Sequence, residues 1–386
     1  MKIGFFTDTY LPVVHGVEIS IETFRKSLEK MGHQVFIYAP YHPGYKDKNP
    51  GVFRLKSVRI IKKPEMRFAF PLAAAGHLKK IIDFKLDVVH AHTPFSLGIL
   101  GKFISARQNI PLIYTHHTDY PEYAKAYMKE KFILPSLARW WSGWFSNASD
   151  AILAPSLKIK KQLKDYGVKK PIYILPTGVD LEIFKKTRKS LSRAKTLKNK
   201  LSVSPKDQAL IFVGRMGKEK NIDFLIRAFG EIKKKRNAVK FILIGDGPYL
   251  GELKVLAAKL KISESIIFTG AISHETLPFY YQLADVFVFS SLTETQGIVI
   301  IEAIGSSLPI VALKDAAFSG AVIDNQNGFL ISPRSSAKLF ADKILKILRD
   351  PNIQKRFSGN SFKIAQKFSD RSQAKKLLRI YKSLLS

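Results

Sequence analysis

The chain of 386 residues is long enough for two domains, since a domain typically holds roughly 100–200 residues. Apolar residues make up 46% of the chain, which excludes global disorder, and the lack of cysteine excludes disulfides and thiolate metal sites. Lysine and arginine total 63 against 31 acidic residues, so the net charge of +32 predicts attraction to a polyanion such as an anionic membrane, an acidic glycan or nucleic acid.

Short apolar runs separated by helical patterns organise the first half of the chain. The first run is too short for a signal peptide and leads into Thr7 and Asp8, so we interpret it as a strand. No apolar run approaches the ~20 residues of a membrane-spanning helix. We expect a helix over Ile19–Met31 and strands over Ile3–Phe6, Gln34–Ala39, Val88–His90, Leu112–Thr115, Ala151–Ala154 and Ile172–Leu175.

A basic segment, residues 185–204, separates this half from the next and is expected to be a linker that is partly helical. The alternation then restarts. Expected strands are Ala209–Val213, Lys240–Ile244, Ile266–Thr269, Val286–Ser290 and Pro309–Ala312, and expected helices are Ile222–Lys235, Tyr249–Leu260, His274–Leu283 and Ile298–Ser306. The sequence therefore predicts an α/β fold with two Rossmann-like, doubly wound parallel-sheet domains over residues 1–184 and 205–365. Residues 366–386 would form a C-terminal helix that packs back on the first domain.

Two loops after predicted strands carry residues suited to an anion. Gly16 stands before the first helix, where a glycine lets backbone N–H groups approach a phosphate. It is not part of a G-x-G-x-x-G pattern, which argues against a standard nicotinamide dehydrogenase. Arg215 and Lys220 follow the first strand of the second domain, and two cations at a helix start suit a departing diphosphate. The alternative is that both are ordinary surface cations.

Glu294 and Glu302 lie eight positions apart around the start of an apolar helix. A carboxylate within such a helix is costly to bury unless it accepts strong hydrogen bonds, and a ribose diol supplies two. Gln296, Gly297 and Ile298 would offer backbone N–H groups at the same helix start. The alternative is a helix-capping glutamate with a second glutamate nearby by chance.

Two pairs of histidines follow strand ends in the first domain: His90 with His92, and His116 with His117. Paired histidines at neighbouring strand ends indicate a polar site. Their spacing is compatible with a metal, but no acidic ligand motif and no D-x-D sequence accompanies them. We expect neither a metal nor another cofactor.

Several of these motifs together resemble the retaining glycosyltransferases of the GT-B type, family 4, over nearly the whole chain. They are Gly16-Val17, Thr115-His116-His117-Thr118, Pro176-Thr177-Gly178-Val179-Asp180, Gly214-Arg215 with Lys220, Gly245-Asp246-Gly247-Pro248 and Glu294-x7-Glu302. The runs Phe6-Thr7-Asp8-Thr9-Tyr10 and Thr293-Glu294-Thr295-Gln296-Gly297 are most similar to bacterial enzymes that transfer glucose from UDP-glucose to diacylglycerol. One departure is His15, which stands where many members carry the first of two glycines.

The resemblance implies a fold with a cleft between the two domains and a role for each motif. Arg215 and Lys220 would hold the donor diphosphate, and Glu302 would bind the ribose. Glu294, with the amides after it, would orient the transferred sugar. His117 would contact that sugar or the leaving phosphate, and the segments beginning at Gly245 and containing Ala271 would line the base pocket.

The implied function is a retaining hexosyltransferase that moves a hexose, expected to be glucose from UDP-glucose, to a membrane lipid such as diacylglycerol. Two alternatives with the same fold stay open. One is a GDP-mannose-dependent enzyme acting on phosphatidylinositol, and the other is a soluble polysaccharide glycosyltransferase.

All three tryptophans, Trp140, Trp141 and Trp144, follow the basic residues Lys129, Lys131 and Arg139. Basic residues next to tryptophan are typical of an interfacial amphipathic segment, and Lys62–Leu72 is a second candidate. We therefore expect a cytoplasmic protein bound peripherally to the inner face of the plasma membrane, with an anionic lipid surface as partner.

Three alternatives weigh against this interpretation of the charge. The tryptophans could pack a helix onto the core, and the lysines could be solvated without a specific partner. A basic nucleic-acid-binding protein is the alternative from another class. The chain has no recognition motif and scatters its basic residues over both halves, so we expect no nucleic acid partner.

Overall fold

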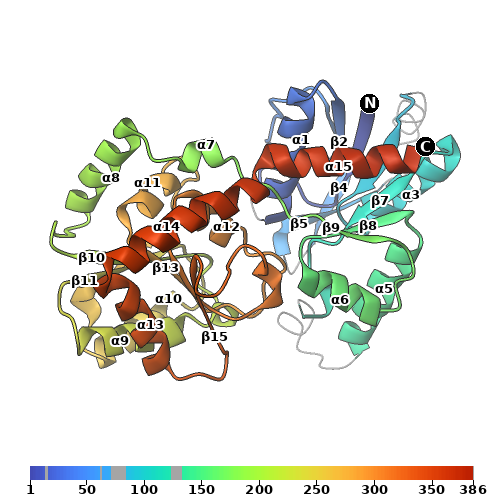
Figure 1. Cartoon of the computed structure of the whole chain (residues 1–386). Helices are drawn as coiled ribbons and strands as arrows, with labels where there is room; N and C mark the ends of the chain where they lie inside the picture. Colours follow the sequence, from blue (N-terminus) through green and yellow to red (C-terminus); the bar gives the residue numbers. More distant parts are fainter. Residues whose placement is uncertain (14–15, 61–62, 71–83, 123–132, 386) are drawn as a thin grey trace. The chain divides into compact units, whose positions relative to one another are not determined.

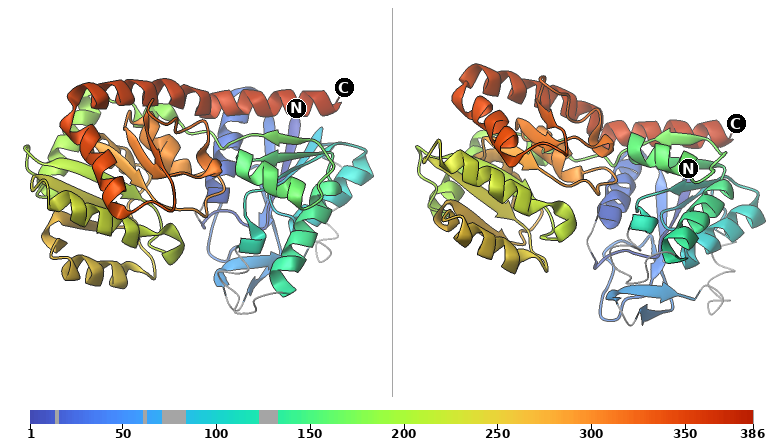
Figure 2. Two further views of the ribbon diagram at one scale, coloured as in Figure 1. Left: turned by 60° about the horizontal axis from the view of Figure 1, so that its bottom comes forward. Right: turned by 90° about the horizontal axis from the view of Figure 1, so that it is seen from below.

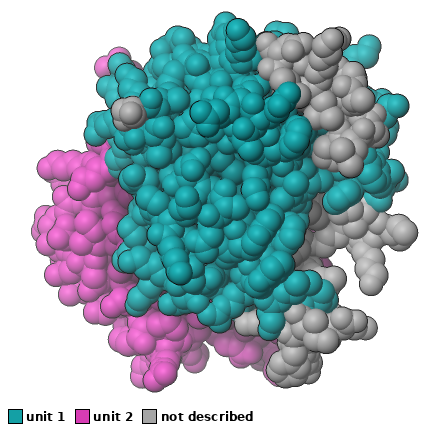
Figure 3. Space-filling view, turned by 90° about the vertical axis from the view of Figure 1, so that its right-hand side faces the viewer, with its two compact units in different colours: residues 1–178, 370–386 teal, residues 179–369 magenta. Residues whose placement is uncertain are grey.

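The computed structural model describes residues 1–385 apart from 14–15, 61–62, 71–83 and 123–132. The chain forms two compact units: unit 1 holds residues 1–178 and 370–386, and unit 2 holds residues 179–369 (Figures 1 and 3). The sequence places this boundary at residue 184. It lies earlier in the structure because helix α7 (Leu181–Phe184) buries Leu181 and Phe184 in the core of unit 2.

Unit 1 is built on a seven-stranded parallel sheet in the order β3-β2-β1-β6-β7-β8-β9, which confirms the predicted parallel sheet. Every adjacent pair in this sheet is parallel. The strands are β1 Lys2–Phe6, β2 Gln34–Pro40, β3 Val52–Leu55, β6 Val88–Ala91, β7 Leu112–Thr115, β8 Ala151–Ala154 and β9 Ile172–Ile174; β4 Ser57–Ile60 and β5 Lys63–Ala69 form a separate antiparallel pair. The helices are α1 Gly16–Lys30, α3 Ser96–Gln108, α5 Ile133–Asn147, α6 Leu157–Asp165 and α15 Asp370–Leu385.

Alternating side chains of β1 give unit 1 two core layers. Ile3 and Phe5 belong to a cluster that contains residues of α1 and α15, including Tyr381. Phe6 belongs to a second cluster with residues of α3, α5 and α6. Because successive side chains of a strand point to opposite faces, a run of apolar residues fills both layers at once. Helices accordingly lie on both sides of each sheet (Figure 2).

Unit 2 is built on a six-stranded parallel sheet in the order β12-β11-β10-β13-β14-β15. Its strands are β10 Gln208–Val213, β11 Val239–Ile244, β12 Ile266–Gly270, β13 Val286–Phe289, β14 Ile310–Leu313 and β15 Gly328–Ile331. Its longer helices are α8 Arg188–Lys200, α9 Ile222–Lys233, α10 Leu250–Lys259, α11 Leu277–Leu283, α12 Ile298–Gly305, α13 Ala337–Arg349 and α14 Pro351–Ala365. In both sheets the strand order reverses beside the first strand, between β1 and β6 and between β10 and β13, while all strands stay parallel. Ligands of doubly wound sheets bind at the carboxyl ends of the strands at such a point.

Most of the expected basic linker is an ordered helix of unit 2. α8 begins with a capping box between Thr187 and Ser190 and packs against α11. Ala194 is buried, and Leu197 and Leu201 are partly buried against the core of the unit. These apolar residues recur at helical spacing between the lysines, so a single face of the helix packs while most of the charges stay in water.

None of the helices within the described residues is both long and apolar enough to cross a membrane.

Candidate active site

The loop after β10 brings together two motifs that are far apart in the sequence. The Lys220 Nζ lies 2.6 Å from Glu294 Oε1, and the two side chains are only 21% and 15% exposed. Arg215 Nη2 lies 2.6 Å from Glu219 Oε1 in a more exposed pair. The ammonium group that we predict to hold a phosphate and the carboxylate that we predict to orient a sugar are therefore in contact.

Close backbone packing holds this loop in place. The Gly214 amide donates to the Ile244 carbonyl at 3.0 Å, and the Met216 amide donates to the Asp246 carbonyl at 2.9 Å. A Cβ on Gly245 would lie 1.9 Å from the Gly214 carbonyl oxygen, so only glycine fits there. The expected base-pocket segment that begins at Gly245 thus also supports the loop that carries Arg215.

Helix α12 begins where the sequence places its anion cradle. Gly297 precedes the helix with φ of 74°, a left-handed conformation that favours glycine, and Ile298 is its first residue. Gln296 is buried. Ser290, at the end of β13, donates its hydroxyl to the backbone carbonyls of Lys220 and Asn221 at 2.9 and 2.8 Å, which joins the two loops of the site. Sequence reasoning missed this serine.

Glu302 is buried in α12, with 3% of its surface exposed. The Tyr281 hydroxyl donates to its Oε2 at 2.8 Å, and His274 Nε2 lies 3.4 Å from its Oε1. His274 belongs to the loop after β12, which also carries Ala271, and Ala271 is exposed. The predicted ribose ligand therefore has a protein partner at each carboxylate oxygen.

Unit 1 gathers the predicted histidines at the ends of β6 and β7. His92 Nδ1 lies 2.9 Å from His117 Nε2, and the rings of His90 and His92 stack at 4.2 Å. His90 also contacts the hydroxyls of Thr115 and Tyr381, each at 2.6 Å. The α15 helix, from the C-terminal end of the chain, therefore contributes to a polar cluster made by strands near the start.

Burial keeps these histidines neutral. It lowers the pKa of His116 to about 4 and, together with the nearby His116, that of His117 to about 3. The pKa values of His90 and His92 lie well below the usual value for the same reason. At neutral pH the cluster offers hydrogen bonds without carrying positive charge. Within the described part of the chain, no group of three or more histidine, aspartate or glutamate side chains is arranged to hold a metal ion.

Two acidic residues that the sequence analysis did not select organise the start of unit 1. Asp8, directly after β1, accepts hydrogen bonds from Thr93, Ser96 and the Leu97 amide, and so ties the start of α3 to β1. Glu18, in the first turn of α1, accepts from Thr9. Gly16 is the first residue of α1 and is exposed, while its neighbour His15 lies outside the described residues.

The tryptophans of α5 divide into two sets. Trp140 and Trp144 are 59% and 37% exposed, and Leu137 on the same helical face is 52% exposed. Trp141 instead donates its indole N–H to the Pro94 carbonyl at 3.0 Å and is partly buried. We call Leu137, Trp140 and Trp144 the α5 apolar face.

Of the two described cations near α5, Lys102 stands beside this face and Arg139 packs on a tyrosine. Lys102 Nζ lies 4.6 Å from the centre of the Trp144 ring, and Arg139 is exposed and lies over the Tyr166 ring. Lys129 and Lys131 lie outside the described residues, as does part of Lys62–Leu72. Phe68 and Phe70, at the end of that second segment, are 44% and 41% exposed.

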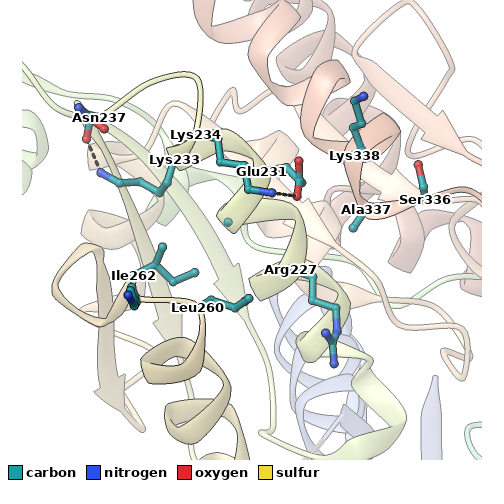
Figure 4. A pocket seen from close by; sticks show the side chains of 12 residues that line it. Arg227, Glu231, Lys233, Lys234, Asn237, Leu260, Ile262, Ser336, Ala337 and Lys338 are labelled. Atoms are coloured by element: carbon teal, nitrogen blue, oxygen red, sulfur yellow. Dashed lines mark hydrogen bonds and ion pairs between the residues drawn. The ribbon is translucent and has the colours of Figure 1, made fainter.

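A hollow of about 670 Å³ in unit 2 contains none of the predicted site residues. Basic side chains of α9 line it, but they do not converge on one point. Figure 4 shows Lys233 directed to the Asn237 carbonyl and Lys234 paired with Glu231.

Comparison with known proteins covers both units. The family model described as Glycosyltransferase Family 4 matches residues 14–183, and the one described as Glycosyl transferases group 1 matches residues 194–364. Alpha-monoglucosyldiacylglycerol synthase of Streptococcus pneumoniae is 36% identical over 334 residues, which are 86% of this chain and 75% of that protein. The Acholeplasma laidlawii protein of the same name is 32% identical over 100% of this chain and 98% of its own length. HepE of Anabaena, solved in complex with UDP, has the same fold, with a TM-score of 0.81 at 20% identity and 100% of both chains covered.

Proposed function

Because the chain belongs to family 4 of the glycosyltransferases and is therefore a hexosyltransferase of the GT-B fold, we propose that it transfers glucose from UDP-glucose to a membrane lipid such as diacylglycerol, with retention of configuration. The observation that carries the proposal is the contact of Lys220 with Glu294 beside the start of α12. A glycosyl donor consists of a sugar and a nucleoside diphosphate. The contact joins the cation that we assign to the leaving diphosphate to the carboxylate that we assign to the sugar.

The charges of unit 2 suit the departure of a nucleoside diphosphate. As the bond between sugar and phosphate breaks, negative charge grows on the leaving oxygen. Arg215, Lys220 and the positive end of α12 would neutralise that charge. Glu302 would accept hydrogen bonds from the ribose, and Glu294 would fix the hydroxyls of the sugar. We propose that the reaction needs no divalent metal, since these groups already supply the positive field.

His117 would contact the transferred sugar. Its low pKa leaves it neutral, so it can donate or accept a hydrogen bond without adding positive charge. We therefore assign it orientation of the sugar and not neutralisation of the leaving group.

The lipid acceptor is supported by the names of the two relatives and by the surface of unit 1. The α5 apolar face exposes two tryptophans to water and has Lys102 beside Trp144, and tryptophan next to a basic residue suits the boundary of an anionic membrane. We propose that this face docks on the inner leaflet of the plasma membrane and so gives the enzyme access to its acceptor.

The proposal is tested by incubating the purified protein with sugar nucleotides and acceptors in matched pairs. UDP-glucose, UDP-galactose and GDP-mannose are each offered with vesicles that contain diacylglycerol, with vesicles that contain phosphatidylinositol, and with a soluble oligosaccharide. We expect glucosyl-diacylglycerol from UDP-glucose, with an α-linkage by NMR and undiminished yield in EDTA.

The other outcomes contradict distinct parts of the proposal. Mannose transfer to phosphatidylinositol would overturn the donor and the acceptor, and transfer to the oligosaccharide alone would overturn the lipid assignment. A β-linked product would overturn retention. Loss of activity in EDTA that magnesium restores would overturn metal independence.

A further inference from the structure

A buried carboxylate requires hydrogen-bond donors, and the donor to Glu302 comes from another helix. The residues that flank Glu302 in α12 are all buried: Ile300, Ile301, Ala303 and Ile304. The one side-chain hydroxyl that donates to the carboxylate is that of Tyr281 in α11, at 2.8 Å from Oε2 within the described structure. An ionised group in such surroundings is held by these contacts in a definite orientation.

Tyr281 is itself fixed. It is fully buried, and its ring lies 5.8 Å from that of Phe184 and 6.0 Å from that of Phe287. Burial, with Glu302 as its neighbour, raises the pKa of Tyr281 well above its ordinary value, so the hydroxyl keeps its proton and donates a hydrogen bond to the carboxylate. A rigid aromatic ring therefore sets the position of the hydroxyl.

The contact leaves the carboxylate able to bind a ligand. Each carboxylate oxygen accepts up to two hydrogen bonds, so Tyr281 uses part of the capacity of Oε2 alone. Oε1 lies 3.4 Å from Nε2 of His274, whose side chain is 52% exposed, so the neighbour of this oxygen is in contact with solvent. Tyr281 therefore contacts one oxygen of the carboxylate, and the other oxygen lies on the His274 side.

We propose that Tyr281 is a positioning residue: it holds the Glu302 carboxylate in the orientation that accepts the ribose hydroxyls of the donor nucleotide, and so sets the preference for ribonucleotides over deoxyribonucleotides. The inference rests on the proposed function, in which Glu302 binds the ribose. Tyr281 acts through Glu302 and does not contact the substrate.

The test compares the binding of UDP, 2′-deoxy-UDP and 3′-deoxy-UDP to the full chain by calorimetry. Tyr281→Phe removes only the hydroxyl. We expect it to weaken UDP binding about tenfold, because a hydrogen bond to a charged group is lost, and to weaken the deoxy analogues less. The ratio of the affinity for UDP to the affinity for each deoxy analogue should therefore be smaller in the variant than in the wild type. In turnover assays KM should rise while kcat changes little, since ribose binding is the same in the ground state and the transition state.

The neighbouring Tyr280→Phe is the matched control. Tyr280 lies in the same helix and is also buried, but its hydroxyl has no contact with Glu302 among those found in the structure. This variant should bind all three nucleotides like the wild type.

A second arm keeps the inference falsifiable if Tyr281→Phe unfolds. The second arm combines Tyr281→Phe with Glu302→Gln. The second change removes the carboxylate that Tyr281 satisfies, so the double variant contains no unsatisfied buried carboxylate. If Tyr281 acts through Glu302, the double variant should bind UDP no more weakly than Glu302→Gln alone.

Each contrary result has a separate meaning. Equal losses for UDP and both deoxy analogues, or additive effects in the double variant, would overturn the role of Tyr281. Unchanged binding in Glu302→Gln would overturn the ribose assignment on which that role depends. If the wild type binds no UDP at all, the proposed donor fails, and the inference fails with it.

Discussion

The Nζ of Lys220 lies 2.6 Å from Oε1 of Glu294, although 74 positions separate the two residues in the chain. Both side chains are largely shielded from water, so their attraction is stronger than that of a surface pair. The bond that a glycosyltransferase breaks lies between sugar and phosphate. A group assigned to the phosphate and a group assigned to the sugar are expected to be neighbours, and here they touch.

Removal of either diphosphate cation should abolish most of the transfer without unfolding the protein. We expect Arg215→Ala and Lys220→Ala each to lower kcat/KM by about 10²–10³, the usual cost of one lost electrostatic donor. Lys218→Ala is the control, because Lys218 is exposed in the same 3-10 turn and should be nearly silent. Steady-state kinetics with thermal melts measure both effects. Normal turnover in the first two variants would refute the diphosphate assignment.

The two glutamates should affect different kinetic constants. Glu302→Gln should mainly raise KM for the donor, because ribose binding contributes equally to the ground state and the transition state. Glu294→Gln should mainly lower kcat, because Glu294 is assigned to the sugar that moves. If the measured partition is reversed, the two roles are exchanged.

The α5 apolar face should determine membrane binding. We expect flotation with vesicles only when anionic lipid is present, and weaker binding as salt rises, because exposed charges are screened over about 10 Å at 0.1 M. The double variant Trp140→Ser, Trp144→Ser should lose the binding that persists at high salt, since that part is apolar insertion. Trp141 is left in place because its indole N–H is bonded to the Pro94 carbonyl.

A variant of another exposed apolar residue is the control for this experiment. Val255 in unit 2 is 69% exposed, and Val255→Ser should leave flotation unchanged. The docking surface is wrong if a folded double variant floats like the wild type. If the wild type ignores anionic lipid, charge does not bring it to the membrane.

The neutral histidines should make unit 1 less stable in mild acid. The pKa of His116 is about 4 in the folded chain and about 6.5 when unfolded, so between these values the unfolded chain binds the extra proton. The stabilisation that neutral His116 gives to the folded chain is present above pH 6.5 and is lost as pH falls toward 4. The free energy of unfolding then falls by up to about 1.4 kcal/mol per pH unit. From pH 6.5 to 5, His116 alone should lower the free energy of unfolding by about 1–2 kcal/mol.

Denaturant titrations at several pH values check this effect. His116→Gln cannot take up the proton and should have a flatter pH dependence between pH 6.5 and 5, whatever its stability at pH 8. A variant with the same slope as the wild type would show that His116 does not control the acid sensitivity.

Much of the fold was predictable because its strands are buried on both faces. The expected strand Leu112–Thr115 has the same bounds as β7, and Ala151–Ala154 the same as β8. Continuous apolar runs mark such strands clearly. The basic linker was harder, because lysines dominate its composition and only Ala194, Leu197 and Leu201 reveal the packed face of α8.

The candidate site was predictable where a polar residue interrupts an apolar pattern. Glu302 stands out in α12 for this reason, and Asp8 carries the same signal directly after β1 although it was not selected. Tyr281 carries no such signal, since it reads as one more aromatic residue in Leu277–Leu283. Its role depends on where its hydroxyl points, and the one-dimensional pattern does not contain that direction.

By itself, the sequence determined the two parallel sheets, the family and the positions of the charged residues that we propose for the glycosyl donor. These follow from local patterns: apolar runs of strand length, and charged residues at strand ends. Only the tertiary structure decided that Lys220 meets Glu294, that Tyr281 holds Glu302, and that Trp141 turns inward while Trp140 and Trp144 face water. Each of these depends on the approach of elements distant in the chain, and that approach is set by the packing of whole helices on the sheets.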